Sequence, residues 1–385
     1  MSAKKIPLYD LKLSRKALDE AEKTLKSGWL TTGSKVEAFE KAVARYTGVR
    51  HAAAVNSGTS GLVITLKLLG ISSRKEVITT PFSFVATTEV ILQCGARPVF
   101  ADINPQTFNI DPDEVLRKVS PRTACILPVD IAGYPADYKS LSEISKRYKI
   151  PLVADACHSF GARYHKKSIP QVADAAVFSF HATKNLTCGE GGMVVSRHAD
   201  FIRAVKVMSR HGMSAGAYQR QKANRWEYDV VNLGWKGNLS DVHASIGLGE
   251  LESFDRNQTA RKKIAHRYLK NLTSLADYLE LPPVDEKIES AWHLFIIRLN
   301  LARLKCDRNR FINLMAQNGV ACGVHYKPIY EFSFYKKMGL TSQSFPNTAF
   351  AGRRVVTLPL YPGLSLKDVD YVCEAVASII NKNAR

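Results

Sequence analysis

The 385-residue sequence lacks the features that mark membrane and secreted proteins. No stretch comes near the roughly 20 consecutive apolar residues that cross a bilayer. The lysines near the start are not followed by the apolar core of a secretory signal. Internal repeats, low-complexity segments and linker tracts are also missing. We therefore expect a globular, cytoplasmic protein that does not associate with membranes.

The cysteines form no recognisable pattern. There are seven, scattered along the chain, and no CxxC pair occurs. This arrangement excludes a regular disulfide framework and a zinc site built on such pairs, and it is typical of a reducing compartment. The sequence thus predicts no bound metal and free thiols at Cys94, Cys125, Cys157, Cys188, Cys306, Cys322 and Cys373.

Acidic residues are scarce. There are 35 aspartates and glutamates against 54 lysines and arginines, which gives a net charge of +19. The basic residues are nevertheless spread along amphipathic segments, without a long Lys/Arg tract or a recognisable nucleic-acid module. An anionic small substrate or general solubility accounts for the charge equally well. We therefore expect no nucleic-acid partner.

The chain has 45% hydrophobic residues and is long enough for a large core and more than one domain. From residue 50 to about 196, short apolar runs alternate with stretches of helical periodicity. This alternation predicts a largely parallel α/β sheet with helices on both faces. The predicted strands are His51–Val55, Glu76–Thr80, Pro98–Asp102, Thr123–Val129, Pro151–Ala154, Ala175–Phe180 and Met193–Ser196, with helices that include Gly61–Leu69, Val85–Gln93 and Ser140–Tyr148.

The pattern changes after Ser240. Residues 241–269 predict one long or broken helix, because Gly247 and Gly249 interrupt its first half. The rest of the chain predicts a smaller α+β unit, and we place the boundary so that residues 1–250 form a large domain and 251–385 a small one. The predicted elements of the small unit are the strands Trp292–Leu299 and Ala321–Tyr326 and the helices Asp307–Gln317 and Leu366–Ile380.

One lysine lies where chemistry is expected. Lys184 follows the apolar run Ala175–Phe180 in a turn of small residues, and Gly189–Gly192 comes directly after. A lysine whose stem enters an apolar wall has a depressed pKa, and its amine can then attack a carbonyl carbon. The spacing alone also fits a solvated loop lysine.

Two further segments place polar groups after predicted strands. Residues 56–60 (NSGTS) stand between a strand and a helix, where unpaired N–H groups and the helix dipole favour a phosphate. They also fit a simple helix cap. Asp155 ends the run that begins at Pro151. There its carboxylate would pair with a cationic ring nitrogen, cap a helix or form a structural ion pair.

The three features together match the needs of one cofactor. Pyridoxal 5′-phosphate carries a phosphate that suits a helix N-terminus, a ring nitrogen that pairs with a carboxylate, and an aldehyde that reacts with an amine. In an open α/β sheet all three would meet beyond the carboxyl ends of the strands. The sequence therefore predicts that residues 56–60, Asp155 and Lys184 hold this cofactor.

The order of motifs resembles the DegT/DnrJ/EryC1/StrS family of sugar aminotransferases over nearly the whole chain. The resemblance implies the fold-type-I architecture of pyridoxal-phosphate enzymes, with a mostly parallel seven-stranded sheet domain and a smaller α+β C-terminal domain. The motifs are residues 27–33, 56–59, 84–87, 155–158, 179–192, 291–294, 325–326 and 358–362.

The resemblance assigns roles at the cofactor. Lys184 would bind its aldehyde and later carry the proton of the amino transfer, and Asp155 would pair with its ring nitrogen. His158, which stands where many relatives have glutamine, would approach the ring hydroxyl as a third catalytic residue. Phe84 would stack on the ring. The remaining cofactor contacts implied are Gly58, Thr59, Ser60, Ser179 and Asn238.

The resemblance also implies a sugar-nucleotide site shared between two subunits of a homodimer. Lys236 and Asn238 lie in the segment that relatives contribute to the partner's site, and they replace asparagine and arginine. This variant resembles the subgroup that acts on UDP-linked 4-keto sugars. Lys236 could reach a phosphate or be a plain surface lysine, and Asp130 replaces a frequent histidine. The implied substrate residues are Trp29, Leu30, Thr31, Thr32, Ser57, Lys236, His325 and Tyr326.

The implied reaction moves an amino group from an amino acid, glutamate by expectation, to C4 or C3 of a UDP- or dTDP-linked keto deoxysugar. Such a reaction serves amino-sugar, lipopolysaccharide or natural-product biosynthesis. A branch of the family that performs dehydration has histidine in place of the lysine, and Lys184 is intact here. Other pyridoxal-phosphate classes lack the context of Trp292, His293, His325 and Tyr326. A non-catalytic sugar-nucleotide-binding relative would be favoured by loss of Lys184 or Asp155.

Overall fold

Seven strands form the central sheet of the computed structural model, which describes residues 4–224, 226–339 and 344–385. Two hydrogen-bonded groups, β1-β9-β8-β5 and β4-β2-β3, are joined by parallel bridges from Ile126 to Leu152 and from Val129 to Asp155. Only β9 runs antiparallel to its neighbours. The predicted seven-stranded, mostly parallel sheet is thus confirmed, with strands β1 (His51–Val55), β2 (Glu76–Thr79), β3 (Arg97–Phe100), β4 (Thr123–Ile126), β5 (Val153–Asp155), β8 (Ala175–Ser179) and β9 (Gly192–Ser196).

Alternating side chains bury both faces of this sheet. In β1, Ala52 and Ala54 join the core on one face, while Ala53 and Val55 join the core on the other. Successive strand residues point to opposite faces, so a strand without polar residues predicts a sheet covered on both sides. The covering helices are α2 (Ser34–Thr47), α6 (Tyr138–Tyr148) and the first half of α9 on one face, and α3 (Gly58–Leu68), α4 (Ala86–Gln93) and α7 (Ala199–Met208) on the other.

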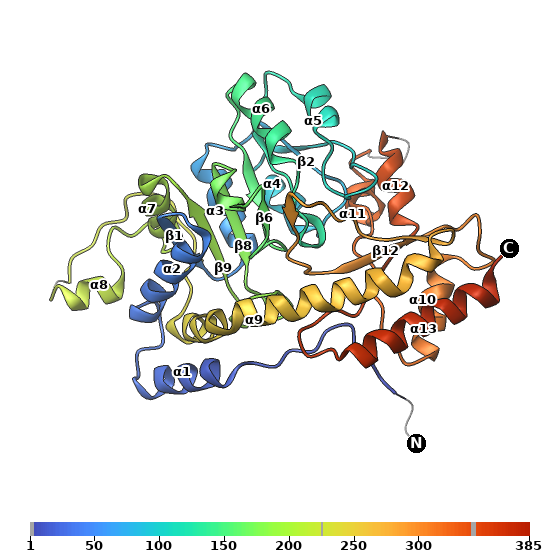
Figure 1. Ribbon diagram of the computed structural model, residues 1–385. Coiled ribbons are helices and arrows are strands. Elements are labelled where there is room, and N and C mark those ends of the chain that lie inside the picture. The colour runs from blue at the N-terminus through green and yellow to red at the C-terminus, as the bar shows by residue number, and fades with distance from the viewer. Residues whose placement is uncertain (1–3, 225, 340–343) are drawn as a thin grey trace.

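Helix α9 (Asp241–Leu272) runs along the molecule beneath the sheet, with α1 (Arg15–Lys26) and α13 (Leu366–Asn383) beside it (Figure 1). The predicted interruption is wrong, because the helix passes through Gly247 and Gly249 unbroken. These glycines instead permit close packing. A Cβ on Gly247 would lie 2.6 Å from the Phe39 ring, and one on Gly249 would lie 2.4 Å from Cα of Ala17.

The second core lies around the other half of α9. The antiparallel sheet β10-β12-β13 packs here with α10 and α13, and Ile6 from the start of the chain joins them. The predicted strand Ala321–Tyr326 is wrong: Gly323 forms an isolated bridge with Thr357, the Ala321 N–H donates to the Ile6 carbonyl, and Tyr326 contacts Phe82 and His158 of the sheet domain. The boundary at residue 250 falls inside α9 and stays a prediction. The elements are β10 (Leu279–Glu280), β12 (Phe295–Leu299), β13 (Val355–Leu358) and α10 (Arg308–Gln317).

The remaining elements lie at the periphery. A small sheet joins β11 (Ile288–Glu289) to the hairpin of β6 (Arg163–Tyr164) and β7 (Lys167–Ser168). The segment of α8 (Ala217–Lys222) projects away from the body of the molecule (Figure 1). No helix in the described ranges is long and apolar enough to span a membrane. The other helices are α5 (Pro112–Lys118), α11 (Ser333–Lys336) and α12 (Pro346–Gly352).

Candidate active site

A cavity of about 330 Å³ opens where β5 and β8 end and α3 begins. We call it the lysine cavity. Asp155 closes β5, and Ser179 closes the parallel neighbour β8, so both face the same edge of the sheet. Lys184 lies in the turn after β8, with four residues between it and Ser179. The cavity is lined by these three residues together with Ser57, Gly58, Thr59, Phe84, Thr87, Cys157, His158, His293, His325 and Tyr326, among others.

The N-terminus of α3 forms one end of the lysine cavity. Ser57 caps this helix by accepting the N–H of Ser60 at 3.1 Å, and the two hydroxyls lie 3.0 Å apart. Ser60 is therefore turned to the cap and does not line the cavity. A Cβ on Gly58 would lie 2.8 Å from Sγ of Cys157, so glycine permits this close approach between the helix terminus and Cys157. The cap and the anion-binding end coexist in one helix terminus.

Burial lowers the pKa of Lys184 from its usual value, and the nearby Cys157 and Asp155 only partly oppose this shift. Because desolvation penalises the ammonium form, the neutral amine is populated at lower pH than in an exposed lysine. The backbone N–H of Lys184 donates to the carbonyl of His181 at 3.0 Å, which fixes the turn. The side chain is thus prepared to act as a nucleophile.

Asp155 is 4% exposed and lies in the same cavity. Its Oδ2 accepts a hydrogen bond from the Thr87 hydroxyl at 2.7 Å, and its Oδ1 accepts the N–H of Cys157 at 3.3 Å. Sequence reasoning had noted Thr87 only as part of a motif, and its position in the first turn of α4 gives no signal of this contact. Thr87 holds the carboxylate in place without neutralising it.

Besides the exposed His181, three histidines line the lysine cavity. The Nε2 atom of His158 lies 3.0 Å from Oη of Tyr326, while its buried Nδ1 has no hydrogen-bond partner in the described structure. Burial, together with the charges of Lys184 and His325, lowers the pKa of His158 well below its usual range. Burial lowers the pKa of His325 to about 4. Around neutral pH these imidazoles are therefore uncharged.

His293 also belongs to this group, although sequence reasoning gave it no role of its own. Its ring lies 4.5 Å from that of His158, and its Nδ1 is 3.2 Å from Oδ1 of Asn185. Asn185 in turn donates to the carbonyl of Ala291 at 2.6 Å. The residue after the lysine thus ties the lysine turn to the small unit.

Phe84 and Tyr326 form an aromatic wall of the lysine cavity. Phe84 is 59% exposed, and its ring centroid lies 6.4 Å from that of Tyr326, which leaves an aromatic face open to the lysine cavity.

Asp130 is fully buried and accepts hydrogen bonds from Tyr138 at 2.8 Å and Ser159 at 2.5 Å. Burial raises the pKa of Asp130 to about 7. These internal contacts occupy the residue that replaces a frequent histidine.

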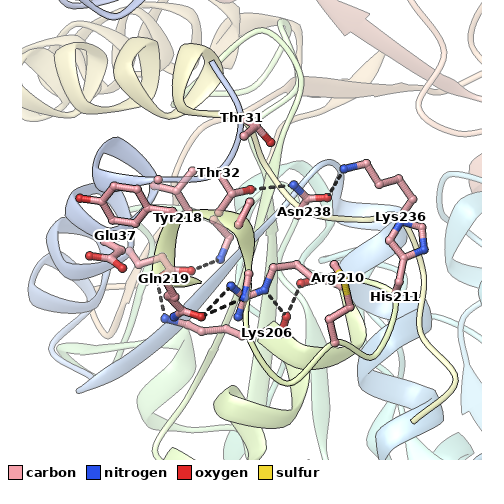
Figure 2. A pocket seen from close by; sticks show the side chains of 18 residues that line it. Thr31, Thr32, Glu37, Lys206, Arg210, His211, Tyr218, Gln219, Lys236 and Asn238 are labelled. Carbon is pink, nitrogen blue, oxygen red and sulfur yellow. Dashed lines mark hydrogen bonds and ion pairs between the residues drawn. The ribbon is translucent and has the colours of Figure 1, made fainter. Parts of the chain in front are cut away.

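A second group of predicted residues lies in a separate cavity, the α8 cavity, between α2, α7 and the α8 segment (Figure 2). Thr31, Thr32, Lys236 and Asn238 line it. Asn238 donates to the Thr32 hydroxyl at 2.6 Å, and the Lys236 amine donates to Oδ1 of Asn238 at 2.8 Å. Within one chain these residues therefore do not join Lys184, whereas Ser57, His325 and Tyr326 do.

The two remaining predicted substrate residues line neither cavity. Trp29 packs edge-on against Tyr218 at 5.5 Å, and Leu30 is 45% exposed. They nevertheless precede Thr31 directly. The lysine cavity therefore combines the predicted catalytic and cofactor residues except Ser60 and Asn238.

The pattern of the DegT/DnrJ/EryC1/StrS aminotransferase family matches residues 12–377. The chain belongs to this family. The spore coat polysaccharide biosynthesis protein SpsC of Bacillus subtilis is 37% identical over 376 residues, which cover 97% of this chain and 96% of SpsC. A putative sugar aminotransferase of Streptococcus pneumoniae, Spr1654, has a TM-score of 0.93 and 30% identity over 98% of this chain and 99% of its own. The Helicobacter pylori aminotransferase PseC, involved in pseudoaminic acid biosynthesis, has a TM-score of 0.91 and 28% identity over 98% of this chain and 100% of its own.

As a sugar aminotransferase of this family, this protein uses pyridoxal 5′-phosphate. Solved structures of its relative Spr1654 include PLP and PMP forms. The residues present fit the cofactor. The N-terminus of α3 at Gly58 suits the phosphate, and the fixed carboxylate of Asp155 suits the ring nitrogen. The exposed face of Phe84 suits the ring, and the unpartnered Nδ1 of His158 supplies a polar contact. Lys184 supplies the amine.

The lowered pKa of Lys184 predicts a pH-dependent stability. Between the lowered pKa of Lys184 in the folded protein and its usual 10.5, the unfolded chain binds more protons than the folded one. The buried ammonium therefore destabilises the folded protein fully at low pH, and this destabilisation vanishes above pH 10.5. We expect Lys184→Met to raise the melting temperature of the cofactor-free protein at neutral pH, and this gain should shrink as the pH rises. Differential scanning fluorimetry across neutral to alkaline pH measures it, with Lys118→Met on α5 as the control. A gain that grows with pH would contradict the assignment.

Proposed function

We propose that the protein transfers an amino group from an amino acid, glutamate by preference, to C4 or C3 of a UDP- or dTDP-linked keto deoxysugar. The proposal depends above all on the lysine cavity, where Lys184, Asp155 and the N-terminus of α3 converge. The sugar aminotransferase and polysaccharide-biosynthesis relatives support a sugar acceptor. The product would enter amino-sugar biosynthesis for cell-surface glycans such as lipopolysaccharide, or for natural products.

Each residue of the lysine cavity has a defined task in this proposal. Bound pyridoxal phosphate withdraws electrons from the carbon that bears the amine. Asp155 keeps its charge opposite the ring nitrogen, while the terminus of α3 holds the phosphate. Lys184, free to exchange its proton because its pKa is lowered, moves the proton at that carbon. His158 and Tyr326 hold each other at the cavity wall.

The α8 cavity is the proposed source of the contacts to the nucleotide diphosphate. Lys206, Arg210, His211 and Lys236 all line it. Two of them are already engaged, because Lys206 pairs with Glu40 and Arg210 donates to the carbonyl of Lys206. The Lys236 amine donates to the neutral Oδ1 of Asn238 and has no ion pair in the described ranges, so its charge is available to a phosphate.

We further propose that the enzyme works as a cytoplasmic homodimer in which each active site receives the 234–240 segment of the other subunit. The segment between α8 and residue 234 supports this arrangement. It exposes several apolar side chains that a monomer would leave in water, namely Trp226 (83% exposed), Tyr228 (54%), Val230 (58%), Val231 (59%) and Leu233 (81%). Such a patch is typical of a protein interface.

Shared sites can be tested by mixing two inactive variants. Lys184→Ala lacks the amine, and a double change of Lys236 and Asn238 to alanine lacks the segment's polar groups. If sites are shared, the mixed dimer contains one site with all its residues, and remixing under dissociating conditions should restore roughly a quarter of the wild-type activity. A mixture that stays as inactive as its components would contradict the shared site.

The acceptor is tested by running the reaction backwards. The pyridoxal form is offered a panel of UDP-, dTDP- and GDP-linked 3- and 4-amino sugars, and conversion is followed by absorbance. We expect conversion with UDP- or dTDP-linked members. If no amino sugar of the panel changes the absorbance, while glutamate still converts the enzyme, the result would favour another class of acceptor.

A further inference from the structure

A third cavity, of about 370 Å³, adjoins the lysine cavity on the side of the small unit. We call it the arginine cavity. It shares Lys184, His293 and His325 with the lysine cavity, so the same amine is reached from both. Its other walls come from residues 8–12, which cross over it, from α9 and from residues 357–363. A small molecule held here would lie beside the reacting lysine.

Arg261 of α9 lies in the wall of this cavity and is 6% exposed. One guanidinium nitrogen, Nη1, donates to the carbonyls of Leu360 at 3.1 Å and Trp292 at 3.4 Å. Its Nε is buried without any partner. In the described ranges, no aspartate or glutamate forms an ion pair with it. The two carboxylates that line the same cavity have other contacts: Asp10 pairs with Lys12, and Glu250 accepts the N–H of Ser14. The buried charge is thus left without a counterion.

One other arginine in the described ranges is as deeply buried as Arg261, and it has a carboxylate partner. Arg298 pairs with Glu280. Arg261 departs from this pattern, and burial lowers its pKa to about 10. A buried guanidinium is costly unless an anion is supplied. Its planar fork matches a carboxylate or a phosphate, and the amino-acid donor of the proposed reaction carries carboxylates.

We infer that Arg261 binds a carboxylate of the amino-acid donor, which places the donor's amino group at Lys184. This inference rests on the proposed transamination, since only that reaction requires an amino acid beside the lysine. It gives the donor an approach on the side of the small unit, and the side of the lysine cavity lined by Ser57 and Tyr326 is left to the sugar. The class of ligand is therefore an amino acid or its keto acid, recognised as a carboxylate.

The test measures binding of 2-oxoglutarate to the pyridoxal form by calorimetry, which requires no turnover. Arg261→Met should weaken this binding by about 10-fold to 100-fold, the range expected for a lost charge-assisted hydrogen bond. Lys263→Met, which removes an exposed charge from the same helix, should bind as the wild type does. Glutaramide, a neutral analogue of the same length, should bind the wild type and Arg261→Met with the same affinity.

Because Arg261 also holds two backbone carbonyls, a second variant leaves it in place. Asn257 lies four residues earlier on α9 and lines the same cavity. Asn257→Asp supplies the missing counterion from the protein itself and should weaken 2-oxoglutarate binding by at least about 10-fold. If Arg261→Met and Asn257→Asp both fold and both bind 2-oxoglutarate as tightly as the wild type, the inference is overturned. If Arg261→Met does not fold, normal binding by Asn257→Asp overturns it alone.

The half-reactions separate this inference from the proposed function. Conversion of the pyridoxal form by an amino sugar should proceed in Arg261→Met at a rate within about twofold of the wild type. Conversion by glutamate should slow by about 10-fold to 100-fold. Equal loss in both half-reactions would overturn a donor-specific role. Failure of the wild type with every sugar would overturn the acceptor assignment but leave the binding result standing.

Discussion

Lys184→Ala should reduce amino transfer by at least about 10³-fold, because the change removes both the amine that holds the cofactor and the group that moves the proton. Within one chain, no other lysine of the described ranges lines the lysine cavity. The absorbance of lysine-bound cofactor should vanish from the purified protein at the same time. Steady-state kinetics and an absorbance spectrum measure the two effects.

Two comparisons keep this result interpretable. Lys118→Ala removes an exposed lysine from α5 and should retain wild-type activity and spectrum. Added methylamine should partly restore proton transfer in Lys184→Ala if the fold is intact, since a small amine can enter the space left by the side chain. Wild-type activity in Lys184→Ala would remove the basis for the proposed reaction.

Asp155→Asn should lower the rate on the order of 10²-fold, equivalent to about 3 kcal/mol. Asparagine keeps the size of the side chain and can still accept the hydrogen bond of Thr87, but it carries no charge to pair with a cationic ring nitrogen. The loss should therefore fall on the rate of the chemical step more than on cofactor loading. Single-turnover conversion by glutamate separates the two.

A graded variant tests the same argument. Thr87→Val removes the hydroxyl that donates to Oδ2 of Asp155 but leaves the carboxylate charged. Its effect should be about 10-fold or less, because one of two hydrogen bonds to the carboxylate remains. A larger loss in Thr87→Val than in Asp155→Asn would show that position, and not charge, is what Asp155 provides.

The parts of the site that could be predicted from sequence are those set by local pattern. An apolar run followed by small or polar residues marks a buried strand and its end, which is how Asp155 and Lys184 were located. The cap of α3 is likewise visible in the spacing of Ser57 and Ser60. The resemblance then related these segments to one cofactor.

The residues that sequence reasoning missed meet only through long-range contacts. His293 and Asn185 are 108 positions apart, and Thr87 and Asp155 are 68 apart. No periodicity reports such pairs. The error at Gly247 has the same origin, because the ring of Phe39 that packs against it belongs to another helix. Helix-breaking propensity is weak and is overridden by such tertiary packing.

The division of predicted residues between cavities was also beyond local reasoning. Asn238 bonds both Thr32 and Lys236 in the α8 cavity (Figure 2), and none of the three lines the lysine cavity. The proposed sharing of sites between two subunits would account for that separation. The counterion-free Arg261 is similarly invisible in a sequence rich in arginine and lysine.

The central claim is that Lys184, in the cavity formed with Asp155 and α3, is the lysine that holds pyridoxal phosphate. Borohydride reduction of the holoenzyme, followed by proteolysis and peptide mass spectrometry, tests it directly. We predict one modified lysine, Lys184, and its disappearance when glutamate first converts the enzyme. Modification of another lysine, or of none in a fully loaded enzyme, would contradict the account.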